Sequence, residues 1–188
     1  MSAALDMTPP STLEEFLEWA PYQDLRYEWD GIQPISMTGA TLRHNELANR
    51  MYDALRATLR HTGCSVFRAD AGVRTGAATR MRYPDLVVTC SRLSGRALDV
   101  PDPILIVEVL SDSTTALDRG AKRREYAALP SLRRYVMLVQ EEPLALVCER
   151  DDGFAERRVR DAVHLPEFDL SIPLADLHAG LPRYEPDA

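Results

Sequence analysis

The sequence lacks the features that mark membrane proteins, secreted proteins and proteins that coat nucleic acid. No apolar run approaches the roughly 18 residues of a membrane span, and the first residues, MSAALDMTPPST, include neither a basic nor an apolar signal-peptide region. The net charge of −7 is opposite in sign to that of proteins that neutralise phosphates non-specifically. We therefore expect a cytoplasmic protein with no membrane-spanning segment.

Cysteine is also scarce. The three cysteines, Cys64, Cys90 and Cys148, are far apart and form no CxxC pair. This odd and unpaired set gives no support to a disulfide framework or a zinc knuckle. The sequence instead predicts free, buried thiols, which pack as small apolar side chains.

Composition and length are those of an ordinary globular protein. The chain has 188 residues, of which 45% are hydrophobic and 27% are charged, and a chain of this length can bury most of its apolar surface around one core. We expect a single domain over residues 1–188, with its core at about residues 12–180. Residues 1–10 and 181–188 are expected to be loose tails.

The N-terminal part is expected to form a helix followed by a hairpin. Thr12 precedes LEEFLEWA and Glu15 follows it in the first turn, which is the pattern of a capped short helix. Asp30 and Gly31 lie between two strand-like segments, and this dipeptide is typical of a two-residue hairpin turn. Glu28 would lie on this hairpin.

The rest of the chain alternates between strand and helix patterns. Helices are predicted over residues 41–62 and 114–129, where apolar residues recur at helical spacing, and a short helix is expected near residues 172–180. This alternation predicts an α/β (α+β) fold in which residues 104–110, apolar on both faces, form a central strand. The predicted strands are residues 64–70, 72–76, 84–90, 104–110, 133–139, 144–150 and 154–160.

Glu108 lies inside the apolar strand ILIVEVL, where an unpaired carboxylate would cost several kcal/mol. A salt bridge to a nearby arginine, or a solvated strand end, would explain its place. Asp85 offers another explanation, because it precedes the apolar strand LVV and the two acids could lie on neighbouring strands. Two carboxylates about 4 Å apart repel by about 4 kcal/mol, and a divalent cation such as Mg²⁺ is the simplest way to bring them together.

Several motifs occur in an order that is known from one enzyme superfamily. A Pro-Asp dipeptide alone has no diagnostic value, whereas the ordered set is fairly specific. Over about residues 12–145, the chain resembles the Uma-type, restriction-endonuclease-like branch of the PD-(D/E)XK nuclease superfamily. The motifs are Glu28 in YEWDGI, His44 at a helix start, Pro84-Asp85, Glu108 in EVLS, and Asp118, Lys122 and Tyr126 at four-residue spacing.

The resemblance implies a restriction-endonuclease-like fold, with a mixed central β-sheet flanked by helices. It also implies an endonuclease that depends on Mg²⁺ or Mn²⁺ and hydrolyses phosphodiester bonds of nucleic acid, DNA above all, with a metal-activated water. Asp85 and Glu108 would bind the metal. Glu28 would be an additional acid, unless it is an exposed hairpin residue. His44 would orient water or contact a phosphate, unless it is a surface residue.

The sequence departs from the superfamily at the lysine of the E-x-K motif, because that position is Leu110. Lys122 is the candidate replacement, since Asp118, Lys122 and Tyr126 share one face of the helix that follows the central strand. The alternative is an exposed Asp118–Lys122 pair worth only tenths of a kcal/mol. A second departure is Asp112 in place of proline, which would cap the helix or add an acid to the site.

Three functions agree with this pattern. The first is the metal-dependent endonuclease, which we expect to form a two-fold homodimer, because paired subunits can each cut one strand. The second is a catalytically silent binding or assembly protein, in which Glu108 only forms a structural ion pair. The third is a metal-dependent hydrolase of small phosphorylated molecules, in keeping with the acidic net charge.

Overall fold

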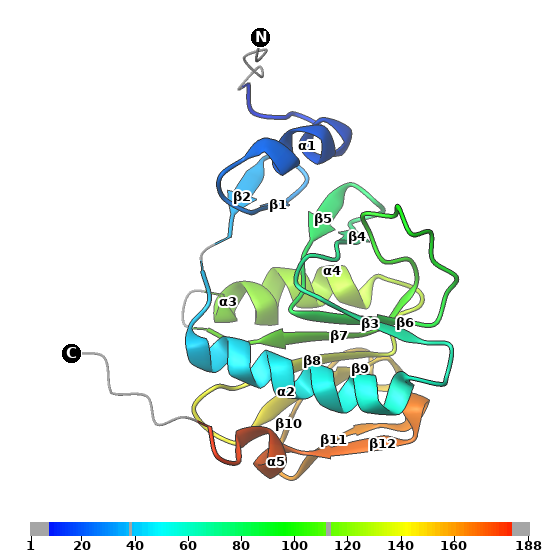
Figure 1. Ribbon diagram of the computed structural model, residues 1–188. Helices are drawn as coiled ribbons and strands as arrows, with labels where there is room; N and C mark the ends of the chain where they lie inside the picture. The colour runs from blue at the N-terminus through cyan, green and yellow to red at the C-terminus, as the bar shows by residue number, and fades with distance from the viewer. Residues whose placement is uncertain (1–7, 38, 112–113, 182–188) are drawn as a thin grey trace, which may run out of the picture.

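The computed structural model describes residues 8–37, 39–111 and 114–181. Most of the two expected tails therefore lies outside the described residues. Within these ranges the chain forms a four-stranded sheet, a six-stranded sheet and a two-stranded ribbon, with helices on both sides of the six-stranded sheet (Figure 1). This arrangement confirms the expected mixed α/β fold.

Helix α1 (Leu13–Trp19) has the predicted N-terminal cap. The Thr12 side chain accepts a hydrogen bond from the Glu15 N–H, and the Glu15 carboxylate accepts one from the Ser11 N–H. These reciprocal bonds satisfy amide groups that a helix start leaves without partners. A 3₁₀ turn, η1 (Ala20–Tyr22), follows α1.

The predicted hairpin belongs to an antiparallel sheet of four strands in the order β2-β1-β5-β4. The segment between its two strands runs from Asp30 to Gln33, and the Asp30 N–H donates to the Gln33 carbonyl at 3.3 Å, so the tip of the turn is Gly31 and Ile32 instead of the predicted Asp30 and Gly31. The reason is that the Asp30 carboxylate accepts hydrogen bonds from two N–H groups of the loop, those of Ile32 and Gln33. Strand β5 was not predicted, because two of its three residues are arginines. The four strands are β1 (Tyr27–Trp29), β2 (Pro34–Ser36), β4 (Val73–Thr75) and β5 (Arg80–Arg82).

The larger sheet has six strands in the order β10-β9-β8-β7-β6-β3. Strands β7 and β8 pair in parallel, and all the other neighbours in this sheet pair antiparallel. The parallel pair is possible because a helix crosses over between the two strands. The strands are β3 (Ser65–Arg68), β6 (Leu86–Thr89), β7 (Pro103–Val109), β8 (Arg134–Leu138), β9 (Ala145–Glu149) and β10 (Glu156–Val159).

One face of the six-stranded sheet is covered by α2 (Leu42–Leu59) and by C-terminal elements. These elements are the antiparallel ribbon of β11 (Ala162–Leu165) and β12 (Leu170–Pro173), and α5 (Leu174–His178) (Figure 1). Both α2 and the short C-terminal helix confirm the sequence-based expectation. The ribbon was not predicted. The remaining 3₁₀ turns are η3 (Arg150–Asp152) and η4 (Pro166–Phe168).

The helix that follows β7 covers the opposite face and is not uniform. It begins as α3 (Thr115–Leu117), continues as the π-helical segment η2 (Asp118–Lys122) and ends as α4 (Arg123–Ala127). The defining bond of the π segment runs from the Arg123 N–H to the Asp118 carbonyl, one residue further back than in an α-helix. The predicted helix is therefore present, with a local widening at its centre.

Strand β7 carries buried apolar side chains on both faces, as predicted for a central strand. Leu105, Val107 and Val109 pack in the core that includes α2. Ile106 and Leu110 pack in the core that includes the crossover helix. Glu108 therefore shares the face of Ile106 and Leu110, and lies under the crossover helix.

The prediction of free thiols is wrong for two of the three cysteines. Cys64 and Cys90 form a disulfide, whereas Cys148 is free and buried as expected. The pair forms because Ser65 of β3 lies opposite Thr89 of β6 in the antiparallel register, so that the flanking cysteines meet. Among the helices described here, none has the length and apolar composition needed to cross a membrane.

Helix α1 is fixed to the four-stranded sheet by an aromatic contact. Phe16 is fully buried, and its ring centroid lies 5.6 Å from that of Trp29, next to Glu28. Phe16→Ala leaves a cavity there and should lower the free energy of unfolding by about 3–5 kcal/mol in urea denaturation. Leu25→Ala is the control, because the Leu25 side chain is 58% exposed and its truncation should change stability by less than about 0.5 kcal/mol. Equal effects would contradict this packing.

Candidate active site

Asp85 and Glu108 lie opposite each other at one end of the neighbouring strands β6 and β7. Leu86 pairs with Val107 in the antiparallel register, which places the preceding Asp85 opposite Glu108. The Asp85 N–H donates to Glu108 Oε2 at 3.3 Å, and the Val109 N–H donates to Asp85 Oδ2 at 2.7 Å. The backbone of each strand therefore holds the carboxylate of the other, and the two predicted acids come together.

Lys122 points into the protein and meets three carboxylates. Its Nζ atom lies 3.1 Å from Glu108 Oε1, 3.2 Å from Glu28 Oε1 and 3.4 Å from Asp118 Oδ1. Only 7% of the Lys122 side chain is exposed, so the alternative of an exposed Asp118–Lys122 pair is wrong. Lys122 therefore reaches Glu108 as predicted. It does so from the crossover helix, whereas the lysine of an E-x-K motif would follow Glu108 along the chain.

Tyr126 and Asp118 complete the predicted helix face. The Tyr126 hydroxyl donates to Glu108 Oε1 at 3.2 Å and is fully buried. Asp118 Oδ1, in contrast, is buried and has no hydrogen-bond partner among the described residues, so its contact with Lys122 is one of charge. Asp118 lies in the π segment and Tyr126 lies one turn after it, in α4; π segments occur frequently at functional sites.

Glu28 is buried and not an exposed hairpin residue. Its Oε1 atom accepts a hydrogen bond from the Tyr83 N–H at 3.1 Å in addition to the contact with Lys122. Its Oε2 atom lies 3.1 Å from a guanidinium nitrogen of Arg82. Glu28 therefore has cationic partners on both oxygens, and it links the four-stranded sheet to the crossover helix.

Two residues of this network, Arg82 and Glu125, were missed by the sequence analysis. The buried Arg82 guanidinium donates to both oxygens of Glu125, at 2.8 and 2.9 Å, and the Thr75 hydroxyl donates to the same carboxylate at 3.0 Å. Burial alone would lower the pKa of Arg82, but Glu125 and Glu28 raise it above its ordinary value. The sequence contains one local signal for this pair, the three-residue spacing of Lys122 and Glu125. This spacing places both side chains on the same side of the helix.

His44 contacts Asp85 from α2, which covers the face of the six-stranded sheet opposite the crossover helix. Thr41 caps α2 and its hydroxyl accepts from the His44 N–H at 3.1 Å. The His44 Nε2 atom lies 3.2 Å from Asp85 Oδ2, and only 12% of the imidazole side chain is exposed. The Nδ1 atom is buried and has no hydrogen-bond partner within the described ranges. The reading of His44 as a plain surface residue is therefore wrong.

The cluster carries more negative than positive charge. Glu28, Asp85, Glu108 and Asp118 face two cationic side chains, Lys122 and Arg82. Burial raises the pKa of Glu108 to about 8; Lys122 opposes this shift, and Asp85, Asp118 and Glu28 add to it. Burial would lower the pKa of Lys122, but Glu108, Glu28 and Asp118 raise it above its ordinary value. The cluster therefore favours an additional proton or cation.

The two facing carboxylates fit a hard divalent cation. Mg²⁺ is commonly bound by one or two carboxylates, with water and phosphate oxygens at the other positions. Across the described part of the chain, no group of three or more His, Cys, Asp or Glu side chains is arranged to hold a metal ion. The contacts of Asp85 with Val109 and His44 both use Oδ2, which leaves Oδ1 for a ligand. Asp85 and Glu108 are thus the residues that could hold Mg²⁺, whereas Asp112 lies outside the described residues.

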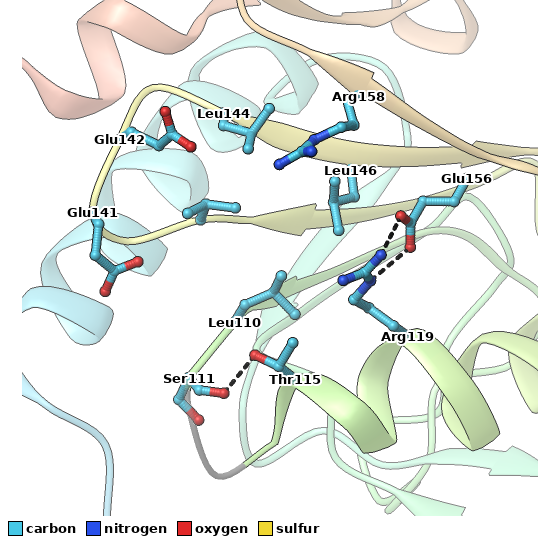
Figure 2. Close-up of a pocket in the computed structure, with 11 residues that line it drawn as sticks. Leu110, Ser111, Thr115, Arg119, Glu141, Glu142, Leu144, Leu146, Glu156 and Arg158 are labelled. Atoms are coloured by element: carbon cyan, nitrogen blue, oxygen red, sulfur yellow. Dashed lines mark hydrogen bonds and ion pairs between the residues drawn. The ribbon is translucent and has the colours of Figure 1, made fainter.

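A pocket of about 260 Å³ is lined by Leu110, the residue that follows β7 (Figure 2). Leu144 and Leu146 add to its apolar wall, and the Arg119 guanidinium closes one side through two hydrogen bonds to Glu156, at 2.9 and 2.7 Å. None of the predicted site residues lines this pocket. The predicted site residues instead contact one another directly.

Two proteins of Synechocystis sp. have similar sequences. The protein slr1290 of Synechocystis sp., named as uncharacterized, is 28% identical over 178 residues, which cover 92% of this chain and 94% of the relative. A second uncharacterized protein of Synechocystis sp., sll1609, is 25% identical over 132 residues, 69% of this chain and 75% of the relative. Both similarities therefore extend over most of this chain.

The fold has a counterpart among solved structures. It is similar to the crystal structure titled as a putative nuclease belonging to DUF820 from Anabaena variabilis, with a TM-score of 0.75 and 16% sequence identity. The similarity covers 89% of this chain and 97% of that chain, and it confirms the fold class. The family model described as "Putative restriction endonuclease" matches residues 13–181. The chain therefore belongs to the Uma2 family of this description, as its motif order predicted.

Proposed function

We propose that the protein is a Mg²⁺-dependent endonuclease that hydrolyses phosphodiester bonds of DNA, and that Asp85 and Glu108 hold the ion. One observation carries the proposal: the two carboxylates face each other on adjacent strands while a buried lysine, Lys122, contacts one of them. Family membership supports the nuclease class. Self-association as a homodimer stays a prediction.

Each residue of the cluster has a role that its contacts support. A bound divalent ion would activate water as a nucleophile and stabilise negative charge on a phosphoryl oxygen. Lys122, held close to Glu108, would stabilise the negative charge that develops during the attack. Glu28, Asp118 and Tyr126 would act indirectly, because they fix the positions of Lys122 and Glu108.

The contacts of His44 support a role in positioning Asp85. Its Nε2 atom lies 3.2 Å from Asp85 Oδ2, and its Nδ1 atom is buried. His44 would therefore fix the orientation of the Asp85 carboxylate beside the ion. The orientation of water and a contact with phosphate stay predictions for this residue.

Removal of either facing carboxylate should abolish DNA cleavage. Asp85→Asn and Glu108→Gln keep the size of the side chains but remove the negative charge that would hold the ion, and we expect at least about a 100-fold loss of rate. The measurement is cleavage of single-stranded, double-stranded and branched DNA with Mg²⁺ or Mn²⁺. Nucleotides in the same screen test the hydrolysis of small phosphorylated molecules.

Glu142→Gln is the matched control for this experiment. Glu142 is an exposed carboxylate that pairs with Arg160, and it has no contact with Asp85 or Glu108. Cleavage by this variant should equal that of the wild type. DNA cleavage that persists in Glu108→Gln would show that the activity does not come from this cluster.

One observation favours a second function, a catalytically silent binding or assembly protein. Lys122 and Arg82 already neutralise part of the cluster, and both oxygens of Glu108 have hydrogen-bond partners. A cluster of this kind can also serve as a buried ion-pair network that holds the crossover helix to the four-stranded sheet. In that case Glu108 would need no metal.

Titration with Mn²⁺ separates the two functions. For the nuclease we expect heat of binding in calorimetry and a higher melting temperature, since a ligand at about 100 times its Kd stabilises the folded state by about 2.7 kcal/mol. Asp85→Asn should lose both effects and Glu142→Gln should keep them. A flat titration with an unchanged melting temperature would support the silent protein.

The stability of the metal-free protein should fall as the pH rises from about 5 to 8. Burial raises the pKa of Glu108 to about 8, so the folded state keeps a proton that the unfolded chain loses near its ordinary pKa of about 4.3. The folded state then binds more protons in this window, and each pH unit costs at most about 1.4 kcal/mol.

Urea denaturation between pH 5 and 9 measures this slope, with chelator present. Glu108→Gln has no carboxyl group to titrate and should reduce the slope. Burial also raises the pKa of Asp118, so its contribution has the same sign. An equal slope in Glu108→Gln and the wild type would contradict the raised pKa of Glu108.

A further inference from the structure

Gln140 is a buried polar residue in the turn between β8 and β9, and both ends of its side chain are bonded. Only 6% of Gln140 is exposed. Its Nε2 atom donates to the Leu110 carbonyl at 2.6 Å, and its Oε1 atom accepts from the Thr41 hydroxyl at 3.0 Å. A carboxamide can donate and accept on one planar group, and Gln140 uses both capacities to join the start of α2 to the end of β7.

Both partners of Gln140 lead directly to the candidate active site. Thr41 is the N-cap of α2, and its hydroxyl also accepts from the His44 N–H at 3.1 Å. Leu110 follows Val109, whose N–H holds Asp85 Oδ2. Since His44 Nε2 lies 3.2 Å from that same oxygen, the contacts form a closed ring through α2, β6, β7 and the β8–β9 turn.

The first turn of α2 needs such an anchor. The buried residues of α2 begin at Leu47, and Leu42 at its start is 76% exposed. The first turn therefore contributes no buried apolar side chain to the core, and helix ends of this kind tend to fray. The Thr41–Gln140 and His44–Asp85 contacts attach this turn to the sheet.

The turn that carries Gln140 is itself held in place. The Val139 N–H donates to the Leu144 carbonyl at 3.0 Å, and the Val139 carbonyl contacts His178 Nε2 of α5 at 3.1 Å. The second ring nitrogen of His178 contacts the Leu174 carbonyl at 2.9 Å. Gln140 therefore projects from a fixed turn toward the start of α2.

We propose that Gln140 is a positioning residue, which holds the first turn of α2 so that the His44 imidazole stays on Asp85. It does not touch the reacting atoms and acts through Thr41 and Leu110. The effect on catalysis rests on the proposed nuclease function, whereas the effect on the His44–Asp85 contact does not.

The test follows the imidazole nitrogens of the histidines by ¹H–¹⁵N NMR at one fixed pH. In the wild type, His44 should be a single tautomer with its proton on Nε2. Gln140→Met, which keeps the length of the side chain but neither donates nor accepts, should shift His44 toward the averaged signals of the exposed His61. The His178 signals should stay unchanged, which shows that the β8–β9 turn is intact.

A pair of Thr41 variants tests the same contact from the helix side. Thr41→Ser keeps the hydroxyl and should preserve the His44 signals, whereas Thr41→Val removes it and should reproduce the effect of Gln140→Met. Unchanged His44 signals in both Gln140→Met and Thr41→Val would overturn the proposal. The proposal would also be overturned if Thr41→Ser shifted the His44 signals as much as Thr41→Val does.

Kinetics provide a second readout where the wild type cleaves DNA. Gln140→Met should lower kcat about 10- to 100-fold, because a catalytic group displaced by about 1 Å can cost this much, and KM should stay within about twofold. A rise in KM with kcat unchanged would overturn the catalytic part. Wild-type protein without nuclease activity but with the expected His44 shifts would refute the proposed function and leave the role of Gln140 supported.

Discussion

The ion pairs of Lys122 are the interaction on which the rest of the site depends. A buried ammonium group is stable only where carboxylates compensate for its lost hydration, and here Glu28, Glu108 and Asp118 do so together. They come from the four-stranded sheet, the central strand and the crossover helix. One cation therefore fixes three parts of the fold relative to one another.

This dependence explains why the small N-terminal sheet is part of the site. Strand β1 brings Glu28, and β5 brings Arg82, which binds Glu28 and Glu125 at once. The six-stranded sheet contributes the facing acids, and α2 contributes His44 from the opposite face. The site thus lies where elements from both sheets and both helical layers meet, and Glu28, Glu108 and Asp85 are each held by a partner from another element.

The sequence predicted the parts of the site that have a local signal. An acid in an apolar strand identified Glu108, the Pro-Asp strand start identified Asp85, and four-residue spacing identified Lys122. Arg82 and Gln140 have no such signal, because their partners are 54 and 30 residues away and only the sheet register brings them together. The same holds for the disulfide of Cys64 with Cys90, which joins residues 26 positions apart.

The π segment gives the crossover helix a property that a regular helix would not have. It accommodates one residue more than an α-helical turn between Thr115 and Tyr126. If the same residues were wound as a regular α-helix, the side chains after the segment would be turned by about 100° around the helix axis relative to those before it, and the helix could not direct both groups toward the acidic pair. The wide turn of this short segment, as much as the identity of its lysine, therefore determines whether a chain with this fold can place a cation beside its acidic pair.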